Sequence, residues 1–347
     1  MRILLVDTSL YHPLSPFFLA GLEELSTQPK YEWEFVDEGK FLRPLERSLV
    51  HKAAYRFLGR RPVTYWSLNR TLLAVANRFR PNVVLVVKGA YVSPATLRCI
   101  KQETDAFLVN YATDDPFNSS VNTRDLVNGI PLYDLYACTK RAIMDDVRKA
   151  GCKHVIYVPF GYKPSVHFPE KPRTPEEKNH FASDVVFVGT FDPERIPYFE
   201  ALIRSLPDIS LHLYGGDWGR HPVLRRYHRG FATGREYRLA LGGTKIALHF
   251  VRHANRDGHS LRTFEIPACG AFMLAERTED HLVFFQEDKE VVLFSTPLEM
   301  IEKISYYLKY KEERTNIMLE GHKKVVSCAH TYTDRLRHIL SVAEGML

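Results

Sequence analysis

Short runs of hydrophobic residues recur along this chain, and most are followed by a polar loop and then by a stretch with helical periodicity. The apolar runs predict buried strands at residues 3–6, 31–36, 81–89, 107–111, 135–138, 155–158, 184–190, 209–214, 244–251 and 291–294. Helical periodicity lies between them, at residues 15–25, 65–79, 140–150, 298–310 and 312–345. This alternation is typical of an α/β fold, in which helices cover the faces of parallel sheets.

The alternation is interrupted once, after residue 158. Residues 164–180 are rich in proline and charge and lack periodicity, which indicates a linker. The strand-and-helix pattern resumes at Asp184, and no internal repeat is visible. We therefore expect two α/β domains, one over residues 1–163 and a second from residue 181 onward.

Composition limits the class of protein without identifying it. The chain has 347 residues, of which 45% are hydrophobic and 25% charged, as expected for a globular protein of two domains. A net charge of +6 suits an acidic ligand such as a nucleotide but falls short of a polybasic nucleic-acid binder. The opening residues resemble a strand rather than a signal peptide, and no run approaches the roughly 20 apolar residues of a membrane span. Five cysteines without a CxxC pair predict reduced thiols and no zinc site, so we expect a cytoplasmic protein.

Residues 40–61 form a basic, amphipathic region, with seven lysines and arginines among aromatic and aliphatic residues. Such a helix can lie on an anionic lipid surface, and peripheral contact with the inner face of a membrane is one interpretation. Most amphipathic helices instead pack one face on a core, and we favour that interpretation.

The stretch from Thr244 to Ala275 carries the most chemistry. It predicts a strand at 244–251, a polar loop through His259, a short helix opened by Ser260, and a second strand after Gly270. The first amides of a helix favour anions, and Arg252, Arg256 and Arg262 lie in the same part of the chain. Gly258 leaves room for a ligand near the backbone. The pattern therefore favours a diphosphate site, although any α/β domain contains similar units.

Two carboxylates flank this predicted helix. Asp257 precedes it and Glu265 lies in its second turn, so both can face one ligand and accept hydrogen bonds from sugar hydroxyls.

Polar residues also follow other predicted strands, at the edge where open α/β sheets bind ligands. Lys88 follows the strand at 81–89, and Asp114 and Asp115 follow the strand at 107–111. One of these aspartates can orient or deprotonate a hydroxyl, while turn and cap chemistry explains both equally well. Gly189, Thr190 and Tyr214 end strands of the second domain, where they can approach a ligand or form ordinary turns.

The segment 257–272 (DGHSLRTFEIPACGAF) resembles the donor-site signature of group 1 glycosyltransferases, most closely that of the CgeB-like (spore maturation protein-like) branch. The segments 110–118 (NYATDDPFN), 158–162 (VPFGY) and 186–190 (VFVGT) extend the resemblance over nearly the whole chain. It implies a GT-B fold, in which two Rossmann-like domains face a cleft. The first domain would bind the acceptor, residues 181–315 would bind the nucleotide-sugar, and helices at 316–347 would return to the first domain.

The resemblance also implies roles for individual residues. Glu265 matches the glutamate that holds the nucleotide ribose, and Asp257 stands where the family has a glutamate that approaches the donor sugar. Asp257, Asp115 and Asp114 are the candidate catalytic residues. The candidate donor-binding residues are Gly189, Thr190, Tyr214, Lys245, Arg252, Gly258, His259, Ser260, Leu261, Arg262 and Glu265.

The implied reaction is transfer of a sugar from a nucleoside-diphosphate sugar to a hydroxyl of a glycan or lipid-linked acceptor, in polysaccharide biosynthesis, for example. The family usually retains the anomeric configuration and needs neither metal nor cofactor. Two alternatives remain open at this stage: a sugar-nucleotide epimerase, and a non-catalytic protein that binds a nucleotide-sugar.

Overall fold

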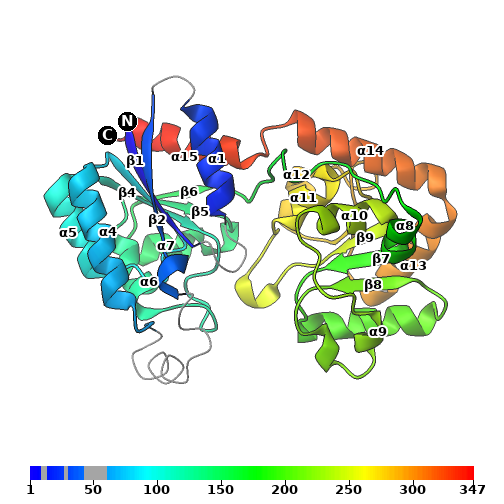
Figure 1. The fold of residues 1–347 in the computed structure, drawn as a ribbon. Helices are drawn as coiled ribbons and strands as arrows, with labels where there is room; N and C mark the ends of the chain where they lie inside the picture. The colour runs from blue at the N-terminus through cyan, green and yellow to red at the C-terminus, as the bar shows by residue number, and fades with distance from the viewer. Residues whose placement is uncertain (9–13, 27–29, 43–60) are drawn as a thin grey trace. The chain divides into compact units, whose positions relative to one another are not determined.

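A computed structural model describes residues 1–8, 14–26, 30–42 and 61–347. The chain forms two compact units. Unit 1 comprises residues 1–160, 253–257 and 332–347, and unit 2 comprises residues 161–252 and 258–331. Both chain termini therefore belong to unit 1 (Figure 1).

Unit 1 is built on a six-stranded sheet in the order β2-β1-β3-β4-β5-β6, and all of its neighbouring strands are parallel. The strands are β1 (Arg2–Asp7), β2 (Glu32–Asp37), β3 (Val83–Val87), β4 (Phe107–Ala112), β5 (Leu135–Cys138) and β6 (His154–Tyr157). Every residue of β3 is buried, as expected for a strand covered on both faces. Its helices are α1 (Ser15–Leu25), α2 (Gly39–Leu42), α4 (Tyr65–Phe79), α5 (Pro94–Thr104), α6 (Arg124–Gly129), α7 (Met144–Lys149) and α15 (Tyr332–Glu344).

Unit 2 repeats this architecture with a five-stranded parallel sheet in the order β11-β10-β9-β7-β8. Its strands are β7 (Ser183–Val188), β8 (Leu211–Tyr214), β9 (Thr244–His249), β10 (Met273–Glu276) and β11 (Val292–Phe294). Its helices are α8 (Pro175–Phe181), α9 (Ile196–Ser205), α10 (Arg235–Gly243), α11 (Arg262–Ala268), α12 (Glu279–Phe284), α13 (Pro297–Lys309) and α14 (Lys311–Ser327). The prediction of an α/β fold with two parallel-sheet units is confirmed.

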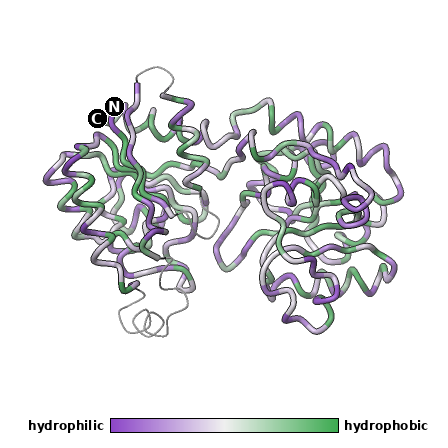
Figure 2. Tube along the Cα trace, in the orientation of Figure 1, coloured by the Kyte–Doolittle hydropathy of each residue, from purple (hydrophilic) through white to green (hydrophobic). Residues whose placement is uncertain are grey.

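Hydrophobic residues concentrate in the strands of the two sheets and in the helices packed on them, and Figure 2 colours such residues green along the chain. In unit 2 the core is strongly aromatic. Trp218 is fully buried, and its ring lies 5.8 Å from that of Phe187 and 5.3 Å from that of Phe199. This tryptophan therefore belongs to the core.

Among the differences from the sequence prediction, two concern residues 164–180 and 312–345. The predicted linker at 164–180 belongs to unit 2 and contains most of α8, whose first turn has a capping box between Thr174 and Glu177. The run predicted at 312–345 is two helices, α14 and α15. The chain leaves the helical path between them because Thr331 forms a parallel β-bridge with Tyr162.

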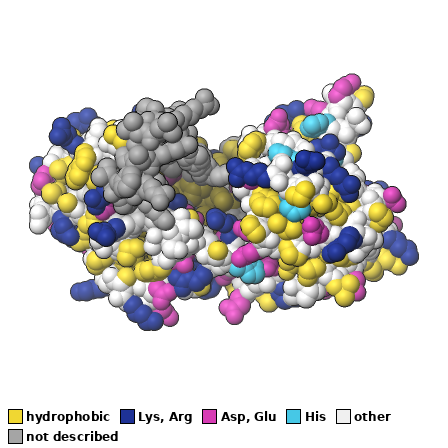
Figure 3. All heavy atoms as spheres, turned by 90° about the horizontal axis from the view of Figure 1, so that it is seen from below, with side chains coloured by type: hydrophobic (Ala, Val, Ile, Leu, Met, Phe, Trp, Pro, Cys, Tyr) yellow, Lys and Arg dark blue, Asp and Glu magenta, His cyan; other side chains and the backbone are white. Residues whose placement is uncertain are grey.

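On the face drawn in Figure 3, charged side chains of both signs are interspersed with scattered hydrophobic ones. Among the described residues, no helix is long and apolar enough to cross a membrane. Most of the predicted basic region at 40–61 lies outside the described residues.

Candidate functional site

The carboxyl ends of the unit 2 strands bring several predicted residues to one edge of the sheet. Gly189 follows β7, and its amide donates a hydrogen bond of 2.9 Å to the carbonyl of Tyr214, the last residue of β8. Gly215, with a φ of 125°, follows β8, and a Cβ there would lie 2.3 Å from the Gly189 carbonyl oxygen. The two loops can pack this closely only because residue 215 is glycine.

Helix α11 begins at Arg262 rather than at Ser260. Side-chain hydroxyl groups accept hydrogen bonds from the backbone amides at this end of the helix. The Ser260 amide donates to Thr263 Oγ1 at 3.2 Å, and the Arg262 amide donates to Ser260 Oγ at 3.2 Å. These two amides therefore already have partners within the chain. The capacity to bind an anion here depends mainly on nearby arginine side chains.

The Thr263 hydroxyl joins two buried histidines to this helix. His281 Nδ1 lies 2.7 Å from the Glu276 carbonyl, which can only accept, so Nδ1 carries the proton. Burial lowers the pKa of His281 to about 4, and the neutral ring accepts at Nε2 from Thr263 Oγ1, 3.0 Å away. His249 Nε2 then donates to the same oxygen at 3.0 Å. This network fixes the first turn of α11.

Gly258 is required by a neighbour within the protein. A Cβ on Gly258 would lie 2.5 Å from Asp280 Oδ2, and that oxygen is 2.8 Å from His259 Nδ1. His259 and Asp280 are both buried. The predicted space for a ligand at Gly258 is thus filled on its Cβ side by a carboxylate of the chain itself.

Glu265 is buried in unit 2 with polar partners on both carboxylate oxygens. The Tyr237 hydroxyl donates to Oε2 at 3.2 Å, and His167 Nε2 lies 3.5 Å from Oε1. His167 Nδ1 accepts from the Lys163 amide at 3.1 Å, so the neutral ring points its Nε2–H at Glu265. Burial lowers the pKa of His167, although Glu265 opposes this effect. The carboxylate is therefore held in a fixed position, as hydrogen bonding to a ligand hydroxyl requires.

Three arginines lie at this edge of unit 2, and one of them, Arg262, lies near Glu265. Arg262 donates through Nε to the Val188 carbonyl at 3.2 Å, and its Nη1 lies 4.0 Å from Glu265 Oε2. Arg195 is 7% exposed and donates through Nη1 to the Thr190 carbonyl at 2.8 Å, while its Nε has no hydrogen-bond partner among the described residues. The pKa of Arg195 is lowered first by burial, and the positive charges of Arg252 and Arg262 lower it further. This edge of unit 2 is therefore suited to an anion.

Arg195 was missed by the sequence analysis. It comes seven residues after the end of β7, in a position comparable to that of Arg252 after β9. A search for arginines in every loop that follows a strand would have found it.

Two further predicted donor-site residues have side chains that are paired or enclosed within unit 2. Lys245 is the second residue of β9, at the amino end of the strand, and pairs with Asp184 Oδ1 at 2.7 Å. Tyr214 is 1% exposed, and its hydroxyl is buried without a partner in the described part of the chain. The ring of Tyr214 is therefore enclosed within unit 2.

The three predicted catalytic aspartates lie together in unit 1. Lys88 Nζ lies 2.8 Å from Asp114 Oδ2. Arg256 binds both oxygens of Asp115, at 2.6 and 3.0 Å. The Asn255 amide nitrogen lies 3.3 Å from Asp114 Oδ1 and 3.0 Å from Asp257 Oδ1. Asp257 therefore belongs to a different unit from Glu265, although both were predicted to face one ligand.

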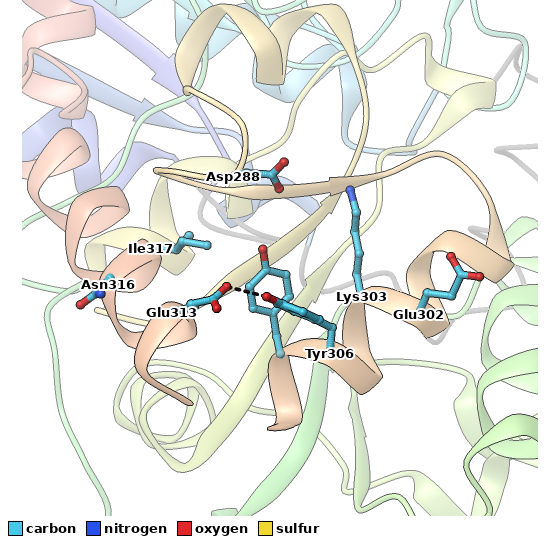
Figure 4. Close-up of a pocket in the computed structure, with 8 residues that line it drawn as sticks. Asp288, Glu302, Lys303, Tyr306, Glu313, Asn316 and Ile317 are labelled. Atoms are coloured by element: carbon cyan, nitrogen blue, oxygen red, sulfur yellow. Dashed lines mark hydrogen bonds between the residues drawn. The ribbon is translucent and has the colours of Figure 1, made fainter. Parts of the chain in front are cut away.

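A pocket of about 640 Å³ lies elsewhere in unit 2, between α13, α14 and the loop before β11 (Figure 4). The Tyr306 hydroxyl donates to Glu313 Oε2 at 2.9 Å across it, and Asp288 and Glu302 add further carboxylates. None of the predicted site residues lines this pocket. Its negative charge does not suit a diphosphate. Within the described ranges, no group of three or more His, Cys, Asp or Glu residues is arranged to hold a metal ion.

This chain is similar to known proteins in part of its sequence and in its fold. A family model described as glycosyl transferase-like matches residues 195–341, which include Arg195, Arg262 and Glu265. No curated protein matches significantly.

Solved structures with the same two-unit fold include three informative ones. HepE from Anabaena in complex with UDP-glucose is 14% identical over 100% of both chains, with a TM-score of 0.67. Sucrose-phosphate synthase from Thermosynechococcus elongatus is 10% identical over 100% of this chain and 99% of its own, with a TM-score of 0.70. A putative UDP-N-acetylglucosamine 2-epimerase from Listeria monocytogenes is 12% identical over 99% of this chain and 96% of its own, with a TM-score of 0.57. The fold is therefore that of GT-B glycosyltransferases.

Proposed function

We propose that this chain is a glycosyltransferase that uses a nucleoside-diphosphate sugar as its donor. The observation that carries this proposal is the buried, hydrogen-bonded carboxylate of Glu265 with Arg262 4.0 Å away, at the same edge of unit 2 as Arg195 and Arg252. A nucleoside diphosphate offers the matching groups, namely ribose hydroxyls that donate to a carboxylate and phosphates that accept from guanidinium groups. The glycosyl transferase-like match over the same residues supports it.

In this proposal, Glu265 accepts hydrogen bonds from the ribose. Arg262, Arg195 and Arg252 neutralise the charge that develops on the departing diphosphate, as preorganised donors do at other sites of charge development. Backbone at Gly189, Thr190 and residues 258–261 completes the donor site. This arrangement needs no metal or cofactor. We assign no donor contact to Lys245 or to the buried ring of Tyr214.

We favour Asp114 over Asp115 as the residue that contacts the acceptor hydroxyl. Both oxygens of Asp115 are bound by Arg256, and Oδ1 also accepts from the Phe117 amide at 2.9 Å. These contacts suit a structural role. Asp114 is 20% exposed at its side chain and pairs with Lys88, so it is better placed to meet an acceptor hydroxyl. Asp257 would contact the donor sugar.

The finer details of the reaction are proposals of the same kind. We propose that the enzyme transfers a hexose, with retention of the anomeric configuration, to a glycan or lipid-linked acceptor. We also propose that it belongs to the CgeB-like branch. In this proposal the protein is cytoplasmic and can contact the membrane surface through residues 40–61. An epimerase is the second candidate, because one solved structure with this fold is described as a putative UDP-N-acetylglucosamine 2-epimerase.

The test measures release of nucleoside diphosphate from a panel of UDP-, GDP-, ADP- and dTDP-sugars, with and without oligosaccharide acceptors. We expect one donor to be consumed, with acceptor-dependent release, and Glu265→Gln to lower this activity. The exposed Glu312 provides the control variant Glu312→Gln. A changed sugar configuration by NMR without any acceptor would favour the epimerase. No consumption of any donor would contradict both candidates.

A further inference from the structure

Lys140 is a buried lysine at the carboxyl edge of the unit 1 sheet. It follows β5 by two residues and is 1% exposed. Buried lysines are rare, because removing an ammonium group from water is costly unless the charge is paired and hydrogen-bonded. A methionine or leucine would fill the same volume without this cost.

The ammonium group of Lys140 has a partner for each of its three protons. Nζ donates to the Thr113 carbonyl at 2.7 Å and to Thr139 Oγ1 at 3.2 Å, and it lies 3.1 Å from Asp257 Oδ1. The first two partners are neutral. Asp257, with 7% of its side chain exposed, is the carboxylate that compensates the charge of Lys140.

Asp257 reaches Lys140 because the segment 253–257 packs on unit 1, although it connects β9 and α11 of unit 2. The side chain of Asn118 donates through Nδ2 to the Ala254 carbonyl at 2.8 Å, and Asn255 Oδ1 accepts from the backbone amide of Asp115 at 3.0 Å. Arg256 adopts a φ of 50°, unusual for a residue with a side chain, and Nη1 lies 2.6 Å from Asp146 Oδ2. Strain of this kind persists only where surrounding contacts hold it in place.

We propose that Lys140 is a positioning residue for the transfer reaction, because its ammonium group holds the Asp257 carboxylate where it contacts the donor sugar. This inference rests on the proposed function. Glu265 is held by Tyr237 and His167 within unit 2, whereas Asp257 is held by Lys140 within unit 1. The contacts that hold Glu265 and those that hold Asp257 are therefore separate, and we expect a change at Lys140 to alter recognition of the sugar and to leave recognition of the nucleotide intact.

The test uses calorimetry on the full chain to compare its affinity for UDP with its affinity for UDP-glucose. GDP is compared with GDP-glucose and ADP with ADP-glucose in the same way. We expect the wild type to bind the nucleotide-sugar more tightly than the nucleoside diphosphate alone. Lys140→Met should bind the nucleoside diphosphate within about twofold of the wild type and lose the sugar-dependent gain, about tenfold for a charged hydrogen-bonded contact. Asp257→Asn should lose the same gain. The double variant should match Asp257→Asn alone, because both changes act through one carboxylate.

Two further variants separate positioning from folding. Lys153→Met removes an exposed lysine and should leave both affinities unchanged. Lys140→Gln, which keeps hydrogen-bond donors but no charge, replaces Lys140→Met if the latter does not fold, and the same loss is expected.

The inference is overturned if Lys140→Met or Lys140→Gln keeps the sugar-dependent gain, if the double variant shows additive losses, or if the wild type gains nothing from the sugar while binding the diphosphate. If the wild type binds no nucleotide at all, the proposed function itself fails.

Discussion

Two buried carboxyl groups at the end of β1 and just after β2 make the stability of unit 1 depend on pH. Asp7 is 3% exposed and Glu38 is 4% exposed. Asp7 Oδ2 and Glu38 Oε1 have no hydrogen-bond partner among the described residues. Burial raises the pKa of Asp7 from 3.8 to about 7, and burial together with the nearby Asp7 raises the pKa of Glu38 from 4.5 to about 8.

Because folding raises the pKa of both carboxyl groups, the free energy of unfolding should fall as the pH rises. A carboxyl group whose pKa is raised on folding stabilises the folded state fully below its unfolded pKa, and this contribution is lost as the pH rises through the folded pKa. Each pKa unit corresponds to about 1.4 kcal/mol. Ionising Asp7 in the folded chain therefore costs about 4 kcal/mol, of which about 2 kcal/mol falls between pH 5 and 7 and about 3 kcal/mol between pH 5 and 8.

Urea-induced unfolding of the wild type and of Asp7→Asn between pH 5 and 8 measures this contribution. The asparagine mimics the neutral acid, so the difference in free energy of unfolding should shift by about 3 kcal/mol in favour of the variant as the pH rises. Glu32→Gln, at an exposed position of the neighbouring strand, should follow the wild type. Parallel pH profiles for wild type and Asp7→Asn would refute the reasoning.

Three further predictions concern unit 2. Gly258→Ala should lower the free energy of unfolding by about 1–3 kcal/mol, because its Cβ would meet Asp280 Oδ2 at 2.5 Å; Gly219→Ala, whose nearest neighbour would lie at 3.8 Å, should have little effect in the same denaturation experiment. Burial holds the pKa of His281 at about 4, so its stabilising contribution should be lost as the pH falls from about 6.5 towards 4, and His281→Asn should flatten that part of the stability profile. Arg195→Gln should weaken binding of a nucleoside diphosphate by about 10- to 100-fold in calorimetry, as for loss of a charged hydrogen bond, whereas the exposed Arg204→Gln should not.

The sheets could be predicted from the sequence because strands such as β3 are buried on both faces and read as continuous apolar runs. Helices α1 and α4 match the predicted residues 15–25 and 65–79 for a different reason, because each has one apolar face and so shows helical periodicity. The break between α14 and α15 could not be predicted, because it depends on a bridge to Tyr162, far away in the chain.

The candidate site could be predicted only in part. The loop before α11 and the position of Glu265 within α11 are local features of the sequence. The role of Gly258 depends on Asp280, and the pairing of Asp257 depends on Lys140, so each needs a contact between distant segments. The start of α11 at Arg262 reflects two hydrogen bonds from backbone amides to side chains, which a helical pattern does not reveal. The functional roles assigned to these residues stay predictions.

The central claim is that Glu265 and the adjacent arginines bind the nucleotide of a nucleotide-sugar. Calorimetric titration of a panel of nucleoside diphosphates and their sugars into the wild type, Glu265→Ala and the exposed control Glu312→Ala tests it most directly. We expect one nucleotide to bind at micromolar level, Glu265→Ala to lose about 1–3 kcal/mol of binding free energy, and Glu312→Ala to lose none. Absence of binding, or equal binding by Glu265→Ala, would contradict the claim.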